Sequence, residues 1–185
     1  EKQQPMSAML QRKQSAMGIG ALKASNKWLE NRIAELEKAE AKSKEADEAF
    51  QENLRYAAQI AEMLDLTILI EPLNHRDAPS YHLQSVEAAT KIISAIGSDR
   101  IKMMFDFYHI QILQGDVLNR FKAHLPFIGH VQIASVPERA EPNLGELNYV
   151  NLIPALYETG YQGYIGAEYR PISDIESGLS WLADY

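Results

Sequence analysis

Four polar side chains in this sequence, each at the end of a short apolar run, could together bind one divalent metal ion. They are Glu71, Asp106, Gln132 and Glu168, and they are spaced 35, 26 and 36 residues apart. Three carboxylates that meet at one point repel one another unless a cation lies between them. Carboxylate and amide oxygens favour a hard ion such as Mg²⁺ or Mn²⁺, and such a site leaves two positions for substrate oxygens.

Each of these side chains has a simpler explanation when it is considered alone. A single Glu at a strand end is usually solvated or salt-bridged, and a single Gln on a strand is usually just hydrogen-bonded. The occurrence of all four at the ends of successive strands favours the metal site.

Short strands that alternate with helices would have to position these side chains. Apolar, β-branched runs predict strands over 67–73, 101–106, 128–133 and 164–168. Helical spacing predicts helices over 85–96, 116–125 and 173–184, and a further helix that ends at Glu158. The start of that helix is left open between Tyr149 and Leu152, because Pro154 fits best in a first turn. This alternation predicts parallel pairing with right-handed crossovers.

The spacing of the four polar residues suits consecutive units of a (β/α)₈ TIM barrel. Such a barrel has about 250 residues, or roughly 31 per unit. On each strand the polar residue shares a face with the residue two positions earlier, namely Leu69, Met104, His130 and Gly166. We therefore expect all four at the carboxyl ends of adjacent strands, where barrel enzymes keep their active sites.

The first 65 residues have a different character and predict a helical segment. Residues 1–25 predict a flexible lead or a short helix with a break at Gly18-Ile-Gly20, and residues 26–65 predict a helix. Its heptad stripe includes Leu29, Ile33 and Leu36 but is charged at Glu40 and Asp47. We expect a break near 42–44 and two successive amphipathic helices, with an extended coiled arm as the alternative. The predicted domains are thus 1–65 and 66–185.

The composition narrows the classes of partner. The 185 residues are 46% hydrophobic and carry a net charge of -7, which argues against nucleic-acid and membrane-surface partners. With no cysteine, disulfides and thiol catalysis are excluded, and we expect a cytoplasmic protein. No apolar run is long enough to cross a membrane. The chain starts with Glu1 and lacks an apolar leader, so we expect no secretory signal and a processed or trimmed N-terminus.

From about Glu52 onwards, several motifs resemble those of the hydroxypyruvate isomerase family of xylose-isomerase-like TIM barrels. They are Ile70-Glu-Pro-Leu-Asn74, Phe105-Asp-Phe-Tyr-His109 with Gln111, Gly129-His-Val-Gln-Ile-Ala134, Gly145-Glu-Leu-Asn-Tyr149 and Glu168-Tyr-Arg-Pro171. Related epimerases have His in place of Gln132. That difference points to hydroxypyruvate isomerase and its relative 2-oxo-tetronate isomerase.

The resemblance implies a metal-dependent isomerase of a small sugar acid, such as hydroxypyruvate. It implies that Glu71 and Glu168 are the acid/base pair as well as metal ligands. His109 would hydrogen-bond a substrate oxygen, and Glu146 would orient the site. Arg139, seven residues after Gln132, is placed to pair with the substrate carboxylate. Structural alternatives stay open for these last three: a loop histidine bonded to backbone, a solvated arginine and a purely structural glutamate.

The resemblance covers four of the eight strands, so it predicts an α/β fold that is the C-terminal half of a TIM barrel after a long or broken helix. The open sheet would leave two unpaired edges and a wet inner face. A second copy, the N-terminal helices or a further chain segment could cover them, and we expect self-association into a homo-oligomer. A second functional hypothesis is a non-catalytic, truncated module that binds metal or drives assembly. A weaker third is another sugar epimerase or a phosphodiester-cleaving barrel, which usually use more than the five histidines present here.

Overall fold

A computed structural model describes the backbone of residues 6–184 and the side chains of residues 24, 26–38 and 43–183. The chain divides into two compact units, residues 1–49 and 50–185. The domain boundary expected at residue 65 remains a prediction, since compactness alone does not test independent folding.

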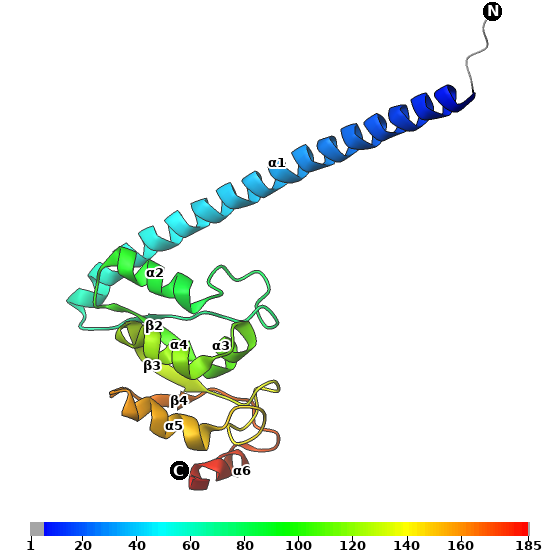
Figure 1. The fold of residues 1–185 in the computed structure, drawn as a ribbon. Helices are drawn as coiled ribbons and strands as arrows, with labels where there is room; N and C mark the ends of the chain where they lie inside the picture. The colour runs from blue at the N-terminus through cyan, green and yellow to red at the C-terminus, as the bar shows by residue number, and fades with distance from the viewer. Residues whose placement is uncertain (1–5, 185) are drawn as a thin grey trace, which may run out of the picture. The chain divides into compact units, whose positions relative to one another are not determined.

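One long helix, α1 (Met6–Met63), runs through the first unit and into the second (Figure 1). The predictions of a break at Gly18–Gly20, of a second break near 42–44, and of two successive helices are therefore wrong. Polar residues interrupt the apolar stripe around Glu40, but Glu, Ala and Lys are strong helix formers, so the backbone continues. An ion pair between Lys44 and Glu48, one turn apart, adds weak local support at 3.9 Å.

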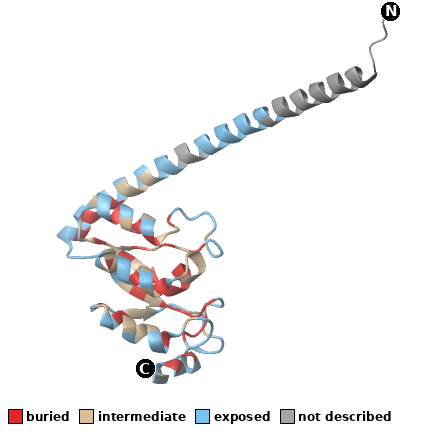
Figure 2. Ribbon diagram, in the orientation of Figure 1, coloured by how far each residue is buried: buried red, intermediate tan, exposed pale blue. Residues whose placement is uncertain are grey.

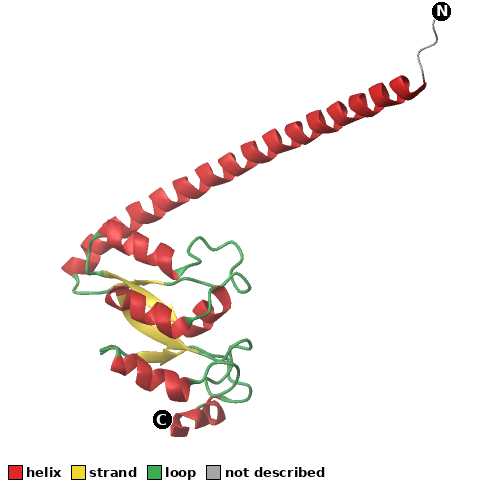
Figure 3. Cartoon of the chain, in the orientation of Figure 1, coloured by secondary structure: helices red, strands yellow, loops and turns green. Residues whose placement is uncertain are grey.

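The second unit is built on a four-stranded parallel sheet with the order β1-β2-β3-β4 (Figure 3). The strands are β1 (Ile68–Ile70), β2 (Ile101–Asp106), β3 (Ile128–Ile133) and β4 (Ile165–Ala167). The predicted fold class is confirmed, and the bounds of β2 and β3 match the prediction. β1 ends before Pro72, whose nitrogen cannot donate to a neighbouring strand.

Helices follow the strands in the expected alternation, with one that the sequence did not predict. They are α2 (Val86–Ile96), α3 (Phe107–Leu113), α4 (Val117–His124), α5 (Tyr149–Glu158) and α6 (Ile175–Gly178), with 3₁₀ helices η1 (Leu125–Phe127) and η2 (Ser180–Asp184). The unpredicted helix is α3. The helix expected over 173–184 is divided into α6 and η2, and Pro154 lies inside α5 rather than in its first turn.

The start of α2 shows how a single side chain fixes a boundary. The Ser85 hydroxyl accepts a hydrogen bond from the Ala88 N–H at 3.0 Å, and Gly97 ends the helix with φ +67°. We expect Ser85→Ala to lower the free energy of unfolding by about 1 kcal/mol, since the Ala88 N–H loses its partner. Chemical denaturation should show this loss, and Ser85→Asp should restore most of it. Equal stability of Ser85→Ala and the parent would contradict the role of the cap.

The core lies between one face of the sheet and the helices. Ile101, Met103 and Phe105 of β2 are fully buried there, and the rings of Phe107 and Phe121 stack edge-on with Phe105. Figure 2 shows buried residues in red along the helices and strands of this unit. Alternate residues of the same strands point to the other face.

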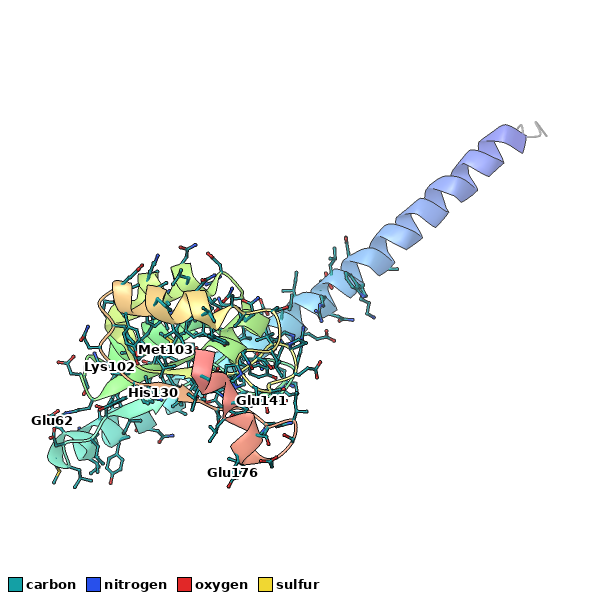
Figure 4. The ribbon with its side chains drawn as sticks, turned by 90° about the horizontal axis from the view of Figure 1, so that it is seen from below. Glu62, Lys102, Met103, His130, Glu141 and Glu176 are labelled. Atoms are coloured by element: carbon teal, nitrogen blue, oxygen red, sulfur yellow. The ribbon has the colours of Figure 1, made fainter. Side chains whose placement is uncertain are left out.

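That other face carries the polar side chains of the sheet. Met104, His130 and Gln132 are only half-buried there, and Figure 4 labels His130 and Lys102 on neighbouring strands. Among the described residues, β1 pairs only with β2, and β4 pairs only with β3. Cover of this face and of these edges by a second copy remains a prediction.

Candidate metal centre

The carboxyl ends of the four strands bring the predicted metal ligands to one edge of the sheet. Glu71 follows β1 directly, and Asp106 is the last residue of β2. Gln132 pairs with Asp106 in register on β3. Glu168 follows β4, where its backbone N–H donates to the Ile133 carbonyl at 3.1 Å.

Glu71, Asp106 and His109 form a group that could hold a metal ion. Each offers one ligand atom, and these atoms lie within 4.8 Å of one another. The Nε2 atom of His109 is 3.7 Å from Glu71 Oε1 and 3.8 Å from Asp106 Oδ2. The sequence placed His109 beyond the strand but gave it a different role from the carboxylates.

Helix α3 explains why His109 is buried in the site rather than on a loop. Asp106 caps this helix by accepting a hydrogen bond from the Tyr108 N–H through Oδ1 at 2.8 Å. One carboxylate oxygen is thus used by the backbone, and the other, Oδ2, faces the site. An aspartate at a strand end followed by a helical run is an N-cap signal that could have predicted α3.

Three of the four predicted ligands have a buried side-chain oxygen without a hydrogen-bond partner in the described part of the chain. These atoms are Glu71 Oε1, Asp106 Oδ2 and Gln132 Oε1. A buried acceptor left unpaired costs about 1–3 kcal/mol. A single cation would satisfy all three, so the donor set fits a hard divalent ion.

The raised pKa values of Glu71 and Asp106 also favour a bound cation. Burial, followed by the charges of Asp106 and Glu168, raises the pKa of Glu71 to about 7. Burial also raises the pKa of Asp106 to about 6, although the Tyr108 N–H and Arg139 oppose the rise. Carboxyl groups with pKa values this high are poorly compensated, and a bound cation would favour their ionised forms.

His109 is held as a neutral hydrogen-bond donor. Its Nδ1 atom accepts from the Asn74 backbone N–H at 3.0 Å and lies 2.8 Å from the Asn74 side-chain amide. Burial, then the charge of Arg139, lowers the pKa of His109 to about 4. A neutral imidazole that accepts at Nδ1 carries its proton on Nε2, so an N–H points towards Glu71 and Asp106. In this tautomer Nε2 is a donor and cannot bind an ion, which leaves the oxygens of the group as its metal ligands.

Arg139 enters the site from the loop after β3 in a left-handed conformation, with φ +55°. Its guanidinium donates to Glu168 Oε2 at 2.7 Å and lies 3.9 Å from Asp106 Oδ2. It also stacks over the ring of Tyr108, 4.9 Å from the centroid. Glu168 is therefore held by an arginine and is not a member of the group formed by Glu71, Asp106 and His109.

Two further residues, Asn74 and Asp77, support the site, and neither was among the residues predicted from the sequence. Asn74 is fully buried, and its side-chain amide donates to Asp77 Oδ2 at 3.2 Å. The hydroxyl of Tyr108 donates to the same oxygen at 3.0 Å. Asn74 ends the Ile70-Glu-Pro-Leu-Asn74 motif, and this motif is the signal that could have identified it, whereas no sequence pattern pointed to Asp77.

Glu146 lies on an exposed turn, where its Oε1 accepts from the Gln111 amide at 3.0 Å. Gly145 precedes it with φ +96°, and a Cβ at that position would collide with the Val136 carbonyl oxygen. The turn therefore requires glycine and presents Glu146 towards α3. The orienting role expected for Glu146 remains a prediction.

The raised pKa of Glu71 predicts a pH-dependent stability of the metal-free protein. The native state holds this proton more tightly than the unfolded state, whose glutamate has the ordinary value of 4.5. Stability from this group is therefore lost as the pH rises from about 4.5 to about 7. We expect the free energy of unfolding of the chelator-treated parent to fall between these pH values by more than that of Glu71→Gln. Chemical denaturation at a series of pH values measures this difference. Parallel pH profiles of the two proteins would contradict the raised pKa.

The model of the family described as "Xylose isomerase-like TIM barrel" matches residues 15–185 of the chain. The chain belongs to this family. The match covers both the sheet with its candidate metal centre and most of α1.

Curated relatives match about three quarters of the chain. The 2-oxo-tetronate isomerase of Cupriavidus necator is 46% identical over 134 residues, covering 72% of this chain and 52% of that protein. The hydroxypyruvate isomerase of Escherichia coli is 41% identical over 134 residues, with the same shares. The chain thus spans about half the length of the curated relatives it matches.

Solved structures show the same fold. The "AP endonuclease, family 2" of Brucella melitensis superposes with a TM-score of 0.73 at 41% identity, over 75% of this chain and 54% of that one. The 3-keto-D-glucoside 4-epimerase of Escherichia coli superposes at 0.64 over the same shares, and its 24% identity supports the fold alone. In the part of the chain that the structure describes, no helix combines the length and apolar character needed to span a membrane.

Proposed function

We propose that this chain carries the metal site of an isomerase that acts on a small sugar acid. The substrate would be hydroxypyruvate, in exchange with tartronate semialdehyde, or a 2-oxo-tetronate. The observation that carries the proposal is the set of unpaired oxygens on Glu71, Asp106 and Gln132 at adjacent strand ends. The substrate class is supported by the relatives at 46% and 41% identity, a 2-oxo-tetronate isomerase and a hydroxypyruvate isomerase.

The proposed ion is Mg²⁺ or Mn²⁺, because all the proposed protein ligands are oxygen atoms. Glu71, Asp106 and Gln132 would hold it, and Glu168 would complete the set once Arg139 releases its carboxylate. When bound, the ion polarises the substrate carbonyl and makes the neighbouring C–H more acidic.

The two glutamates would then move one proton between adjacent carbons. One carboxylate takes the proton from the carbon that bears the hydroxyl group, and an enediolate forms in the substrate. The other carboxylate delivers a proton to the neighbouring carbon. The hydroxyl proton passes from one substrate oxygen to the other, so that the carbonyl and the hydroxyl exchange places. The reaction is redox-neutral overall and needs no oxidant or reductant.

His109 and Arg139 would orient the substrate. The N–H at Nε2 of His109 points into the site and can donate to a substrate oxygen. The Arg139 guanidinium can bind a substrate carboxylate through two parallel hydrogen bonds. Because Arg139 now donates to Glu168 at 2.7 Å, substrate binding would also release Glu168 for proton transfer.

A second candidate function is a non-catalytic module that binds metal or drives assembly. It is favoured by one observation, namely that Arg139 donates to Glu168 Oε2 at 2.7 Å, which keeps this carboxylate out of the group formed by Glu71, Asp106 and His109.

An assay with hydroxypyruvate and Mn²⁺ separates the two candidates. We expect tartronate semialdehyde to form and its formation to stop when the ion is chelated. Tight binding of Mn²⁺ without turnover of hydroxypyruvate or a 2-oxo-tetronate would support the non-catalytic module instead.

A further inference from the structure

The first unit has an apolar stripe on α1 with no partner in the described residues. Leu29, Ile33 and Leu36 are 47%, 53% and 53% exposed, although large aliphatic side chains are usually buried. Their spacing of four and three residues places them on one side of the helix. We call these three residues, together with Asn26, the α1 seam. Figure 2 shows the described helix around it in the colour of exposed residues.

The α1 seam has the residue types of a two-stranded coiled coil. With Ile33 at a heptad a position, Leu29 and Leu36 occupy d positions, and Asn26 occupies the preceding a position. Ile at a with Leu at d favours two strands over three or four in parallel coiled coils, and a single Asn at a fixes the register and the number of strands. In the sequence alone, the same spacing extends to Leu22 and Ile19.

The flanking charges select a second copy in parallel orientation. Arg32 lies at a g position and Glu37 at the e position five residues later. In a parallel dimer these two positions face each other across the interface, so each Arg32 meets Glu37 of the other copy. Within one chain Arg32 contacts Glu35 at 3.2 Å, but an exposed pair of this kind contributes little and can be exchanged.

The sequence also limits the length of the interface. Glu40, Ser43 and Asp47 occupy the next a, d and a positions, and charged residues at such sites oppose close packing. The coiled coil would therefore end near Leu36. The backbone of α1 continues as a helix to Met63.

We propose that the α1 seam binds the same seam of a second copy of this chain, as a parallel two-stranded coiled coil. This inference does not depend on the metal site or on the proposed isomerase activity. It assigns the self-association expected from the sequence to the helix rather than to the open sheet.

Sedimentation equilibrium of the full 185-residue chain tests the proposal. We expect a species of twice 20.9 kDa at micromolar concentrations. Leu29→Glu combined with Ile33→Glu should give a monomer, since charges enter the seam. The matched control is Asn31→Glu combined with Ala34→Glu, which adds two glutamates on the outer side of the same helix and should stay dimeric. Circular dichroism checks that both variants keep their helix content.

Disulfide trapping tests the orientation, because the chain has no native cysteine. Leu36→Cys should form a covalent dimer on oxidation, whereas Ala34→Cys on the outer side should not. Arg32→Glu should weaken the dimer, and adding Glu37→Arg should restore it. A monomeric parent, a dimer that survives Leu29→Glu with Ile33→Glu, or equal trapping at both cysteines would overturn the proposal.

Discussion

Mn²⁺ added to the chelated protein should raise its thermal unfolding midpoint, and Asp106→Asn should abolish that rise. A ligand that binds only the native state stabilises it by about 2.7 kcal/mol at a free concentration 100-fold above its Kd. Asp106 supplies a buried oxygen, Oδ2, that has no partner among the described residues. In Asp106→Asn the side chain is neutral, so the ion loses a charged ligand. If the amide oxygen keeps the bond from the Tyr108 N–H, the amide N–H₂ faces the ion and cannot bind it.

This substitution separates loss of the ion from loss of the fold. Asn caps helices about as well as Asp, so the hydrogen bond from the Tyr108 N–H to residue 106 should survive. The metal-free variant should therefore be at least as stable as the metal-free parent, because it no longer buries a poorly compensated carboxyl group.

Glu141→Gln provides the matched control for the metal experiment. Glu141 is also a buried carboxylate with one unpaired oxygen, Oε2, while its Oε1 accepts from the Ile172 N–H at 3.0 Å. It is not a member of the group formed by Glu71, Asp106 and His109. Its replacement should leave the response to Mn²⁺ intact. A full response in Asp106→Asn, or a lost response in Glu141→Gln, would contradict the assignment of the site.

The sheet could be predicted from the sequence because its signals are local. β2 and β3 are continuous apolar runs that end in a polar residue, and their observed bounds equal the predicted ones. The parallel order follows from the alternation with helices. From that order, the position of Glu71 and Asp106 at one edge could be deduced without coordinates.

The contacts of the site could not be predicted in the same way, because they depend on loops that fold over the strand ends. The bond from the Asn74 N–H to His109 joins residues 35 positions apart, and it fixes which imidazole nitrogen carries the proton. Helix α3 has seven residues, too few for a clear periodicity. Arg139 donates to Glu168 from a left-handed backbone conformation, and an arginine in the sequence does not predict that conformation.

The prediction of a break in helix α1 was wrong because it relied on a pattern that concerns packing. The expected break rested on a gap in the apolar stripe around Glu40, which is a signal about packing partners. Continuity of a helix is decided by the backbone and by intrinsic propensity, and the segment around Glu40 consists almost entirely of good helix formers. In the coiled coil proposed above, the gap would mark where the interface ends, and the helix continues through it.

Glu168→Gln should lower kcat for isomerisation by about 10²–10⁴-fold, which is the usual contribution of a general acid or base. The amide has nearly the same shape and can still accept the hydrogen bond from Arg139, so the arrangement of the loop should be kept. It cannot accept a proton from carbon. The exposed neighbour of Arg139, Glu138, provides a matched control, and Glu138→Gln should keep the parental rate. Steady-state rates with hydroxypyruvate and Mn²⁺ give this comparison.

Exchange of substrate hydrogen with deuterated water then shows which of the two glutamates abstracts the proton and which returns it. If Glu71 abstracts the proton, Glu168→Gln should still exchange hydrogen at the hydroxyl-bearing carbon while product formation stops. If Glu168 abstracts it, both processes should stop, and Glu71→Gln should be the variant that exchanges without isomerising. Mass spectrometry of recovered hydroxypyruvate distinguishes the two orders. Undiminished turnover in Glu168→Gln would remove this residue from the acid/base pair, because no carboxylate would then be needed where Arg139 now holds one.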